Sequence, residues 1–378
     1  MSQRPRVLLL IPHLGGGGAE RVTALLARGL SARKYELHLG LITGLITLTA
    51  SDLVPAGVKI HSLGVRRVRS AALPLMRLVR ELRPDLILSG MAHLNFLVLL
   101  LRPLFPSKTR VVVRQNAMVS ADLRSSRLPV YTRYLYRLLY PQADRIVCQT
   151  RAMAADLVSR SGVRDGQVEV LPNPVDAEAM RAVSQPDLVP DRLGCWQGPG
   201  PHLLAMGRLS HEKGFDLLMQ AFSSVRIQYP AADLKILGTG PELSLLREIC
   251  ATLQLERSVR FGGYVSRPET FFAGATLFVL PSRQEGLPNA LLEGAAGGLP
   301  IVALPASEGV ADLLRGKRGV WLGAEVSARA LTISLMTALE SIGPGERFPH
   351  PWLEAFQMES AIRSYERLID QVLQERAQ

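Results

Sequence analysis

The chain has 378 residues, of which 47% are hydrophobic and 20% charged, a balance typical of a folded protein long enough for two domain cores. Its three cysteines lie far apart without a Cys-x-x-Cys pair, which excludes a disulfide framework and a cysteine-paired zinc site and favours a reducing compartment. The first apolar run, Val7–Ile11, is too short for a signal peptide, and no run approaches the ~18 apolar residues of a membrane span. We therefore expect a cytoplasmic protein.

Charge divides the chain into two unlike halves. Residues 1–172 hold 25 Lys and Arg against 10 Asp and Glu, a net charge of +15, whereas residues 173–378 hold 19 against 23, a net charge of −4. A basic half indicates an anionic partner. Because no helix-turn-helix, zinc-finger or RNA-binding pattern is present, we expect no nucleic acid and favour an anionic membrane surface or a lipid-phosphate substrate. The alternative is that the protein is generally rich in arginine and that its basic half binds no anionic partner.

Short apolar runs alternate with amphipathic segments of helical length, which predicts βαβ units and mostly parallel sheets. In the first half, strands are predicted at Val7–Ile11, Glu36–Thr43, Val58–Leu63, Leu86–Ser89, Arg110–Arg114, Arg145–Gln149 and Val168–Leu171, and helices at Glu20–Ser31, Leu73–Leu82, Leu94–Leu104, Val130–Leu139 and Ala152–Arg160. In the second half, strands are predicted at Leu203–Gly207, Asp233–Leu237, Val259–Gly262, Leu277–Leu280, Ile301–Ala303 and Gly319–Leu322, and helices at Asp216–Gln228, Glu242–Leu253, Pro268–Phe272, Pro288–Ala296 and Ala328–Leu339.

Each half predicts a Rossmann-like α/β domain of its own. The break falls at Pro172-Asn-Pro174, where two prolines stiffen the chain and cannot donate hydrogen bonds. A polar, proline-rich stretch at residues 184–201 then precedes the first strand of the second half. We predict an N-terminal domain at residues 1–172, a C-terminal domain at residues 173–355 and a final helical segment at residues 356–378.

The second half contains two glutamates eight residues apart, in the block Glu285-Gly-Leu-Pro-Asn-Ala-Leu-Leu-Glu293. The block follows one predicted strand and opens a predicted helix. Glu285 is therefore expected in the loop at the carboxyl end of the strand, where open α/β sheets bind ligands. Glu293 is expected about two turns into the helix, on the same side. Two carboxylates at that edge suit a polyhydroxylated ligand, because each accepts hydrogen bonds from hydroxyl groups.

A cationic loop follows the first strand of the second half. Arg208 and Lys213 lie there between Gly207 and Gly214, and a helix is predicted to begin near Phe215. Two cations beside a helix N-terminus are suited to binding a diphosphate.

A second glycine loop, Gly15–Gly18, lies between the first strand and the first helix of the chain. Four glycines allow a ligand to approach the backbone closely. The loop lacks the dinucleotide fingerprint, because Gly40 and Leu41 stand where an acidic residue is required, so NAD binding is disfavoured.

These blocks together resemble the retaining nucleotide-sugar glycosyltransferases with the GT-B fold, a family-4-like group that carries a Glu-x7-Glu motif and includes bacterial enzymes of cell-surface glycan synthesis. The matching blocks stand in the family's order and span nearly the whole chain: Gly15-Gly-Gly-Gly-Ala-Glu-Arg21, Leu171-Pro-Asn-Pro-Val-Asp176, Gly207-Arg-Leu-Ser-His-Glu-Lys-Gly214 and the glutamate block. The resemblance implies an α/β protein of two Rossmann-like domains that face each other across a cleft. It places the acceptor on residues 1–172, the donor on residues 173–355 and the last helix back on the N-terminal domain.

The resemblance also implies a role for single residues. Arg208 and Lys213 would contact the donor diphosphate, Glu285 the transferred sugar and Glu293 the ribose hydroxyls. The remaining donor contacts would come from Gly16, Gly17, Gly238, Tyr264, Val265, Gly286, Leu287, Pro288 and Asn289. No Asp-x-Asp motif is present, so the resemblance implies a diphosphate neutralised by Arg, Lys and a helix dipole, without a metal ion or other cofactor.

The acceptor side is predicted from His93 and the residues after the next strand. His93 is expected in a strand-to-helix loop at the cleft edge, where related bacterial enzymes carry a His-x-x-Asn-like element, and we count it among the catalytic residues. The alternative is a half-buried structural histidine. Many relatives have a histidine after the following strand, where this chain has Arg114 and Gln115. Both can hydrogen-bond a sugar, but neither is a neutral base at pH 7, so the group that activates the acceptor is not identified.

Residues 120–140 interleave arginines with leucines and tyrosines, a pattern typical of a helix that lies on an anionic bilayer. The arginines are Arg124, Arg127, Arg133 and Arg137. The alternative is a helix packed on the sheet, with arginine stems that reach solvent.

The sequence therefore predicts a retaining hexosyltransferase that uses a UDP- or GDP-sugar and a glycan or polyprenyl-linked acceptor, in the cytoplasm or on the inner face of the plasma membrane. One alternative is a non-catalytic subunit that binds nucleotide sugars or glycans, and another is a nucleotide-sugar epimerase of the same fold. The presence of both glutamates and both cations argues against the first alternative, and the glutamate spacing argues against the second.

Overall fold

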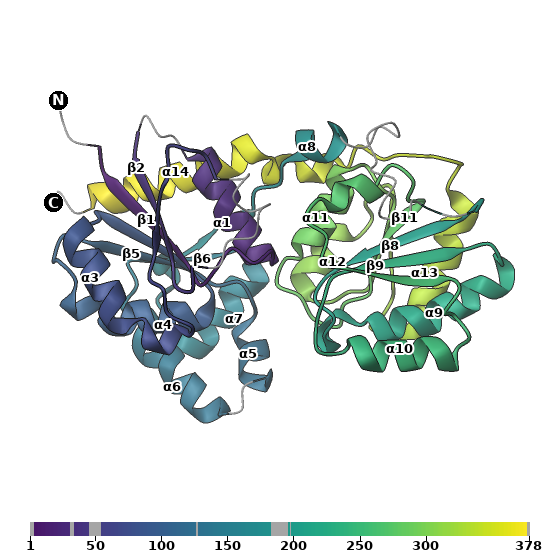
Figure 1. The fold of residues 1–378 in the computed structure, drawn as a ribbon, viewed down its shortest axis with the longest axis horizontal. Helices are drawn as coiled ribbons and strands as arrows, with labels where there is room; N and C mark the ends of the chain where they lie inside the picture. Colours follow the sequence, from purple (N-terminus) through teal and green to yellow (C-terminus); the bar gives the residue numbers. More distant parts are fainter. Residues whose placement is uncertain are drawn as a thin grey trace. The chain divides into compact units, whose positions relative to one another are not determined.

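The computed structural model describes residues 4–30, 34–44, 54–125, 128–182, 196 and 198–375. The chain divides into two compact units, Met1–Pro174 with Ala355–Gln378, and Val175–Glu354. In each unit helices cover a parallel sheet (Figure 1). The donor and acceptor roles given to residues 173–355 and 1–172 stay predictions, as does the cleft between the domains.

The sheet of the first unit has seven strands within the described residues, in the order β3-β2-β1-β4-β5-β6-β7, and all neighbours are parallel. The strands are β1 (Arg6–Ile11), β2 (Glu36–Leu41), β3 (Lys59–Ser62), β4 (Leu86–Gly90), β5 (Arg110–Arg114), β6 (Arg145–Cys148) and β7 (Val168–Val170). The chain runs outward from β1 to β3 and then returns to β4 on the other side of β1. The strand order therefore reverses between β1 and β4, and open α/β sheets bind ligands at such reversal points.

Helices cover both faces of this sheet because successive strand side chains point to opposite faces. Leu8 and Leu10 of β1 pack in one core, whereas Val7 and Leu9 pack in the other. The first core lies under α3 (Ala72–Leu82), α4 (Ala92–Leu101), α5 (Val119–Ser125), α6 (Pro129–Leu139) and α7 (Arg151–Ser161), and the second under α1 (Gly18–Gly29) and α14 (Met358–Gln374). Short 3₁₀ turns occur at η1 (Val68–Ser70), η2 (Arg102–Leu104), η3 (Tyr140–Gln142) and η4 (Asp165–Gln167).

The C-terminal helix α14 belongs structurally to the first unit. Its side chains Ile362, Tyr365 and Ile369 are buried in the same core as Val7 and Leu9. Figure 1 shows α14, in yellow, beside α1, and the two helices are in contact. The predicted return of the last helix onto the N-terminal fold is confirmed.

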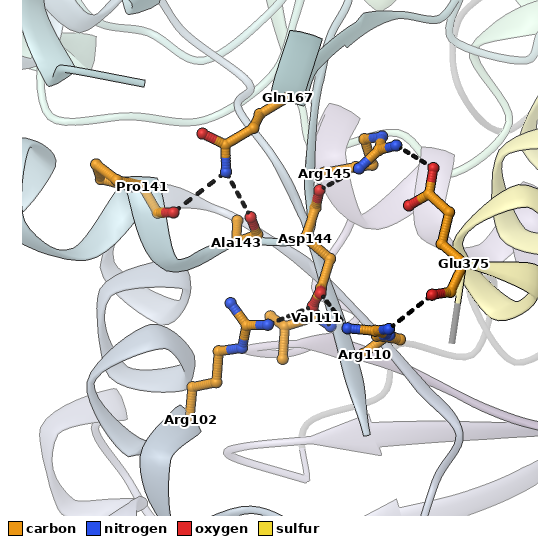
Figure 2. Close-up of polar contacts among 9 residues, drawn as sticks. All are labelled: Arg102, Arg110, Val111, Pro141, Ala143, Asp144, Arg145, Gln167 and Glu375. Carbon is orange, nitrogen blue, oxygen red and sulfur yellow. Dashed lines mark hydrogen bonds and ion pairs between the residues drawn. The ribbon is translucent and has the colours of Figure 1, made fainter. Parts of the chain in front are cut away.

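A network of ion pairs and hydrogen bonds holds the C-terminal end of α14, as Figure 2 shows. Glu375 pairs with Arg145, and its carbonyl oxygen accepts a hydrogen bond from Arg110 at 3.3 Å. Arg110 also binds Asp144 at 3.0 Å, and Asp144 accepts a second guanidinium hydrogen bond from Arg102 at 2.8 Å. Through Glu375, the end of α14 is connected to Arg110 of β5 and Arg145 of β6, at the edge of the sheet opposite the reversal point.

The sheet of the second unit has six strands in the part of the chain that the structure describes, in the order β10-β9-β8-β11-β12-β13, again all parallel. The strands are β8 (His202–Met206), β9 (Asp233–Leu237), β10 (Val259–Gly263), β11 (Leu277–Leu280), β12 (Ile301–Ala303) and β13 (Val320–Leu322). The helices are α8 (Ala177–Ala182), α9 (Phe215–Gln228), α10 (Leu243–Thr252), α11 (Asn289–Ala296), α12 (Glu308–Leu314) and α13 (Ala328–Ser341), with 3₁₀ turns at η7 (His211–Lys213), η8 (Pro268–Phe271) and η9 (Pro351–Phe356). Here the strand order reverses between β8 and β11. The predicted pair of Rossmann-like folds is confirmed.

Three local predictions are wrong. The predicted helix Val130–Leu139 is confirmed as α6, but the arginine- and tyrosine-rich segment 120–140 is not a single helix, because α5 ends at Ser125 and α6 begins with Pro129 in its first turn, a position that proline favours. His93 is not in a loop but in the first turn of α4, because Met91, with a φ of 83°, completes the turn after β4. Glu293 is the fifth residue of α11, little more than one turn from its start. The short helices α8 and α12 were not predicted.

Candidate functional site

Backbone contacts join the loops of the second unit at its reversal point. The N–H of Gly238 donates to the carbonyl of Gly263 at 2.7 Å, and the N–H of Gly207 donates to the carbonyl of Leu237 at 2.9 Å. A Cβ atom on Gly238 would lie 1.9 Å from the oxygen of Gly207, and one on Gly214 would lie 2.1 Å from the oxygen of Pro281. Only glycine permits these approaches. The loops after β8, β9 and β11 therefore form one continuous surface.

Lys213 and Glu285 meet at this surface, although they are 72 residues apart in the sequence. The Nζ atom of Lys213 is 2.5 Å from Oε1 of Glu285, and the hydroxyl of Ser282 donates to the same oxygen at 2.7 Å. The side chain of Glu285 is 9% exposed and that of Lys213 is 24% exposed. A pair this closed to solvent is screened less than a surface pair and fixes both groups in position.

Arg283 holds the cationic loop in place, and sequence reasoning missed it. Its guanidinium donates two hydrogen bonds to Asp216, at 2.6 and 2.5 Å, and one to the carbonyl of His211 at 2.9 Å. Burial opposes ionisation of Asp216, but the hydrogen bonds and charge of Arg283 prevail and lower its pKa. The same hydrogen bonds raise the pKa of Arg283. No spacing rule connects Arg283 with Asp216, 67 residues away, so this contact could not be predicted from the sequence.

Arg208 lies at the beginning of the same loop and is exposed. Burial acts to raise the pKa of the nearby Glu212. A hydrogen bond from Ser210 and the charges of Lys213 and Arg208 outweigh burial and lower that pKa. Helix α9 begins directly after the loop, and its N-cap, Gly214, provides no side-chain hydrogen bond. The first N–H groups of α9 and two cations thus lie close together, an arrangement suited to phosphate oxygens.

The other residues predicted for the donor lie along the same carboxyl edge. Gly286, Leu287 and Pro288 are buried in the loop after β11, Asn289 begins α11, and Glu293 is half-buried one turn later. Tyr264 and Val265 follow β10 at the edge of the sheet, and Tyr264 is 44% exposed. Their individual roles stay predictions. Among the described side chains, no three His, Cys, Asp or Glu residues are close enough together to hold a metal ion.

The reversal point of the first unit carries two histidines and a glutamate. His13 follows β1, its Nδ1 atom accepts a hydrogen bond from the N–H of Gly15 at 3.0 Å, and the same atom lies 3.5 Å from Oε1 of Glu20. Gly16, with a φ of 99°, and Gly17, the N-cap of α1, lie between them. Sequence reasoning identified the glycines but missed the functional potential of His13 and Glu20, although both belong to the glycine block or adjoin it.

His93 reaches the same reversal point from the start of α4, after β4. Desolvation lowers the pKa of His93, and the nearby His13 lowers it further. The structure therefore brings together a predicted site residue, His93, and one that was not predicted, His13.

Arg114 and Gln115, whose side chains can hydrogen-bond a sugar, are buried inside the first unit and bonded to its own residues. They are only 2% and 1% exposed. Arg114 donates to the hydroxyl of Tyr365 at 2.9 Å and to the amide oxygen of Asn173 at 2.7 Å, and Gln115 donates to the hydroxyl of Tyr136 at 3.0 Å. Both residues connect β5 to its neighbours within the first unit.

Comparison with known families assigns both halves of the chain. Residues 16–179 match the family model described as Glycosyltransferase Family 4, and residues 200–341 match the model described as Glycosyl transferases group 1. Together the two matches include the glycine block from Gly16 onward and the other three sequence blocks in full.

Two curated relatives are similar over most of their length. The first is the N-acetylgalactosamine-N,N'-diacetylbacillosaminyl-diphospho-undecaprenol 4-alpha-N-acetylgalactosaminyltransferase of Campylobacter jejuni, 28% identical over 81% of this chain and 82% of the relative. The second is the lipopolysaccharide core biosynthesis glycosyltransferase LpsD of Rhizobium meliloti, 28% identical over 77% of this chain and 76% of the relative.

Solved structures share the fold at low sequence identity. Anabaena Alr3699/HepE in complex with UDP-glucose superposes with a TM-score of 0.79 at 16% identity, over 97% of this chain and 99% of the other. Sucrose-phosphate synthase from Thermosynechococcus elongatus gives a TM-score of 0.78 at 16% identity, over 98% of this chain and all of the other. None of the described helices has the length and apolarity required to cross a bilayer.

Proposed function

The chain belongs to the family-4-like glycosyltransferases with the GT-B fold, and we propose that it transfers a hexose from a UDP- or GDP-sugar to a glycan or polyprenyl-linked glycan. We propose further that the transfer retains the configuration of the anomeric carbon and needs no metal ion. The observation that carries the proposal is the Lys213–Glu285 pair between β8 and β11, because it sets a cation and a carboxylate side by side at the ligand-binding edge of the sheet.

In this proposal the second unit stabilises the diphosphate leaving group. Negative charge develops on the phosphate oxygen as its bond to the sugar breaks. Arg208, Lys213 and the N-terminus of α9 would bind this charge, and Arg283 would keep the loop in position through Asp216. Groups fixed before the reaction stabilise a developing charge without reorganising.

Glu285 and Glu293 would hold the two sugars of the donor. Glu285 is fixed by Lys213 and Ser282 through Oε1, which leaves Oε2 for a hydroxyl of the transferred hexose. Glu293, one turn into α11, would accept from the ribose hydroxyls. A carboxylate held by its neighbours orients a sugar at little entropic cost.

Retention follows if attack and departure occur on the same face of the sugar. The acceptor oxygen would form the new bond to the anomeric carbon, the bond from that carbon to the phosphate oxygen would break, and the acceptor proton would move to the departing phosphate oxygen. The name of the Campylobacter jejuni relative specifies an α-linkage on a diphospho-undecaprenol saccharide. Such a product is what retention of an α-configured nucleotide sugar gives.

Product analysis tests this proposal. The purified enzyme would be incubated with UDP- or GDP-hexoses and a polyprenyl-diphosphate saccharide, with excess chelator in one half of the samples. We expect an α-linked product by proton NMR and equal rates with and without chelator. A β-linked product would contradict retention, and loss of activity in chelator with rescue by Mg²⁺ or Mn²⁺ would contradict metal independence.

A membrane contact completes the proposal, and its surface is formed by α5 and α6. Five apolar side chains there are between 59% and 67% exposed: Leu128, Val130, Tyr131, Tyr134 and Leu138. Arg124, Arg133 and Arg137 are exposed among them, whereas Arg127 lies outside the described residues. We call these eight side chains the α5–α6 surface.

We propose that an anionic lipid surface covers the α5–α6 surface. Apolar and tyrosine side chains mixed with arginines are the composition of an interfacial helix, and the first 172 residues carry a net charge of +15. Placed there, the enzyme would find a polyprenyl-linked acceptor on the same surface. Helix α4, which contacts α6, and the following turn η2 add the exposed side chains of Leu100 and Leu104.

A further inference from the structure

We infer that His13 and Glu20 form a binding site for a sugar hydroxyl at the glycine loop of the first unit, in which the Nε2–H of His13 is the hydrogen-bond donor. The inference rests on the proposed function, because it assigns a ligand contact within the same transfer reaction. Neither residue was identified from the sequence.

The contact of Gly15 fixes the tautomer of His13. A ring nitrogen that accepts a hydrogen bond carries no proton, and the N–H of Gly15 donates to Nδ1 at 3.0 Å. The proton of the neutral ring therefore lies on Nε2. The side chain is 36% exposed, and Nδ1 is occupied by the N–H of Gly15 and lies 3.5 Å from Oε1 of Glu20, so we infer that a ligand reaches the ring through Nε2.

Glu20 determines which ligand groups the loop accepts. Its side chain is 8% exposed, and a Cβ atom on Gly17 would lie 2.3 Å from Oε2, so the carboxylate covers the glycine loop at the N-terminus of α1. Helix N-termini ordinarily attract anions. Here the enzyme's own carboxylate occupies that position and repels a phosphate, whereas it accepts a hydrogen bond from a hydroxyl.

His93 supports the same conclusion from the neighbouring strand. Its pKa is lowered by desolvation and by His13, so both the ring and its surroundings favour the neutral form. The ring nitrogens of His13 and His93 and the carboxylate of Glu20 together offer hydrogen-bond donors and acceptors. This set suits hydroxyl groups of a sugar, on either the donor or the acceptor, rather than the diphosphate.

Two variants of His13 separate its two nitrogens. In His13→Asn the amide oxygen takes the place of Nδ1 and keeps the contact with Gly15, but no donor remains at the position of Nε2. In His13→Gln the amide nitrogen replaces the Nε2 donor, and the contact with Gly15 is lost. We expect His13→Asn to reduce kcat/KM by about tenfold, the effect of one hydrogen bond, and His13→Gln to retain most of the activity.

Two rates identify the sugar that is bound. Slow hydrolysis of the nucleotide sugar in the absence of acceptor reports on the donor alone, and transfer reports on both substrates. A fall of hydrolysis and transfer together in His13→Asn assigns the contact to the donor hexose, and a fall of transfer alone assigns it to the acceptor sugar. Equal activity of wild type and His13→Asn, or a larger loss in His13→Gln than in His13→Asn, would overturn the inference.

Nitrogen NMR of the histidine rings tests the inference without any turnover. In the ligand-free enzyme at pH 8, we expect the Nε2 of His13 to carry the proton and Nδ1 to carry none. A proton on Nδ1 would overturn the inference even in an active enzyme. Failure of the proposed function is distinct, because wild-type enzyme that transfers no sugar from any nucleotide donor would contradict the function and leave the tautomer measurement valid.

Discussion

The two reversal points of the molecule have the same architecture and opposite chemistry. Each lies between the first strand of its sheet and the strand to which the chain returns, and each has a glycine-containing loop that leads into a helix. In the second unit the loop before α9 carries Arg208 and Lys213, and Arg283 fixes it. In the first unit the loop before α1 is covered by the carboxylate of Glu20 next to His13.

The net charge of a unit does not determine the chemistry of its ligand site. The sequence up to residue 172 has a net charge of +15 but carries its carboxylate at the helix start, and the rest has a net charge of −4 but places its cations there. A diphosphate responds to the few groups within a Debye length of roughly 8 Å. In the proposed function, the exposed arginines of α5 and α6 would act on an anionic surface instead of on the diphosphate.

The largest effect is expected from removal of Lys213. Lys213→Ala should lower kcat/KM by the equivalent of about 2–4 kcal/mol, because a positioned charge is lost where negative charge develops. Steady-state kinetics with the nucleotide sugar would measure it. Lys317→Ala is the matched control, since Lys317 is an exposed lysine elsewhere in the same unit. Wild-type kinetics in Lys213→Ala would contradict the assignment of the diphosphate to the cationic loop of the second unit.

The basic first unit should act through its surface rather than its reversal point. Replacement of Arg124, Arg133 and Arg137 by glutamine should weaken binding to anionic vesicles about a hundredfold at low salt, because each cation contributes ~1 kcal/mol there. Vesicle sedimentation at several salt concentrations would measure the effect. The control replaces three exposed arginines of the second unit, Arg247, Arg257 and Arg318.

Vesicle binding that is equal in both arginine triple variants would show that the α5–α6 surface is not the contact. Kinetics with a water-soluble acceptor should be unchanged in the first variant, because these arginines lie on α5 and α6 and none of them belongs to the glycine loop, the cationic loop or the glutamate block. A matching loss of turnover would instead place them in the reaction itself.

Glu285 and Glu293 should affect different steps, one the reaction rate and the other nucleotide binding. Glu293→Ala should weaken the affinity for UDP or GDP by about tenfold, since ribose contacts exist before the reaction, whereas Glu285→Gln should mainly lower kcat. Calorimetry of nucleotide binding and single-turnover kinetics would separate the two effects. A loss confined to nucleotide affinity in Glu285→Gln would reverse the assignment of the residues.

The smallest effect concerns pH and a histidine pair in the first unit. Nδ1 of His38 lies 2.9 Å from Nε2 of His61, and burial lowers the pKa of both rings. Nearby Glu36 stays ionised, because the hydrogen bond from Lys59 lowers its pKa to about 2. A lowered pKa in the folded state means that the unfolded state binds more protons, so stability present above about pH 6.5 is lost as the pH falls.

Urea unfolding at pH 7.5 and pH 5.5 measures this loss. We expect a lower midpoint at pH 5.5 in the wild type and a smaller difference in His38→Gln, with His211→Gln, an exposed histidine, as the control. Identical midpoints of the wild type at both pH values would contradict the prediction.

The sequence allowed the regular elements and the adjacent site residues to be predicted, because buried parallel strands are apolar runs and their loops carry glycine. It did not allow contacts between distant residues to be predicted. Arg114 follows a predicted strand, but its partners Asn173 and Tyr365 are 59 and 251 residues away in the sequence and could not be inferred from its position. A polar side chain at the end of a buried strand forms hydrogen bonds with residues that the fold brings next to it. A single sequence does not show which residues those are.

Hydrogen exchange with bound nucleotide tests the central contrast most directly. At saturating UDP or GDP, we expect slower amide exchange in residues 207–216 and 285–293, which hold the cationic loop and the glutamate block, and a smaller change in residues 13–20. Protection confined to residues 13–20, or unchanged exchange in the two segments of the second unit, would contradict the assignment of the diphosphate to that unit.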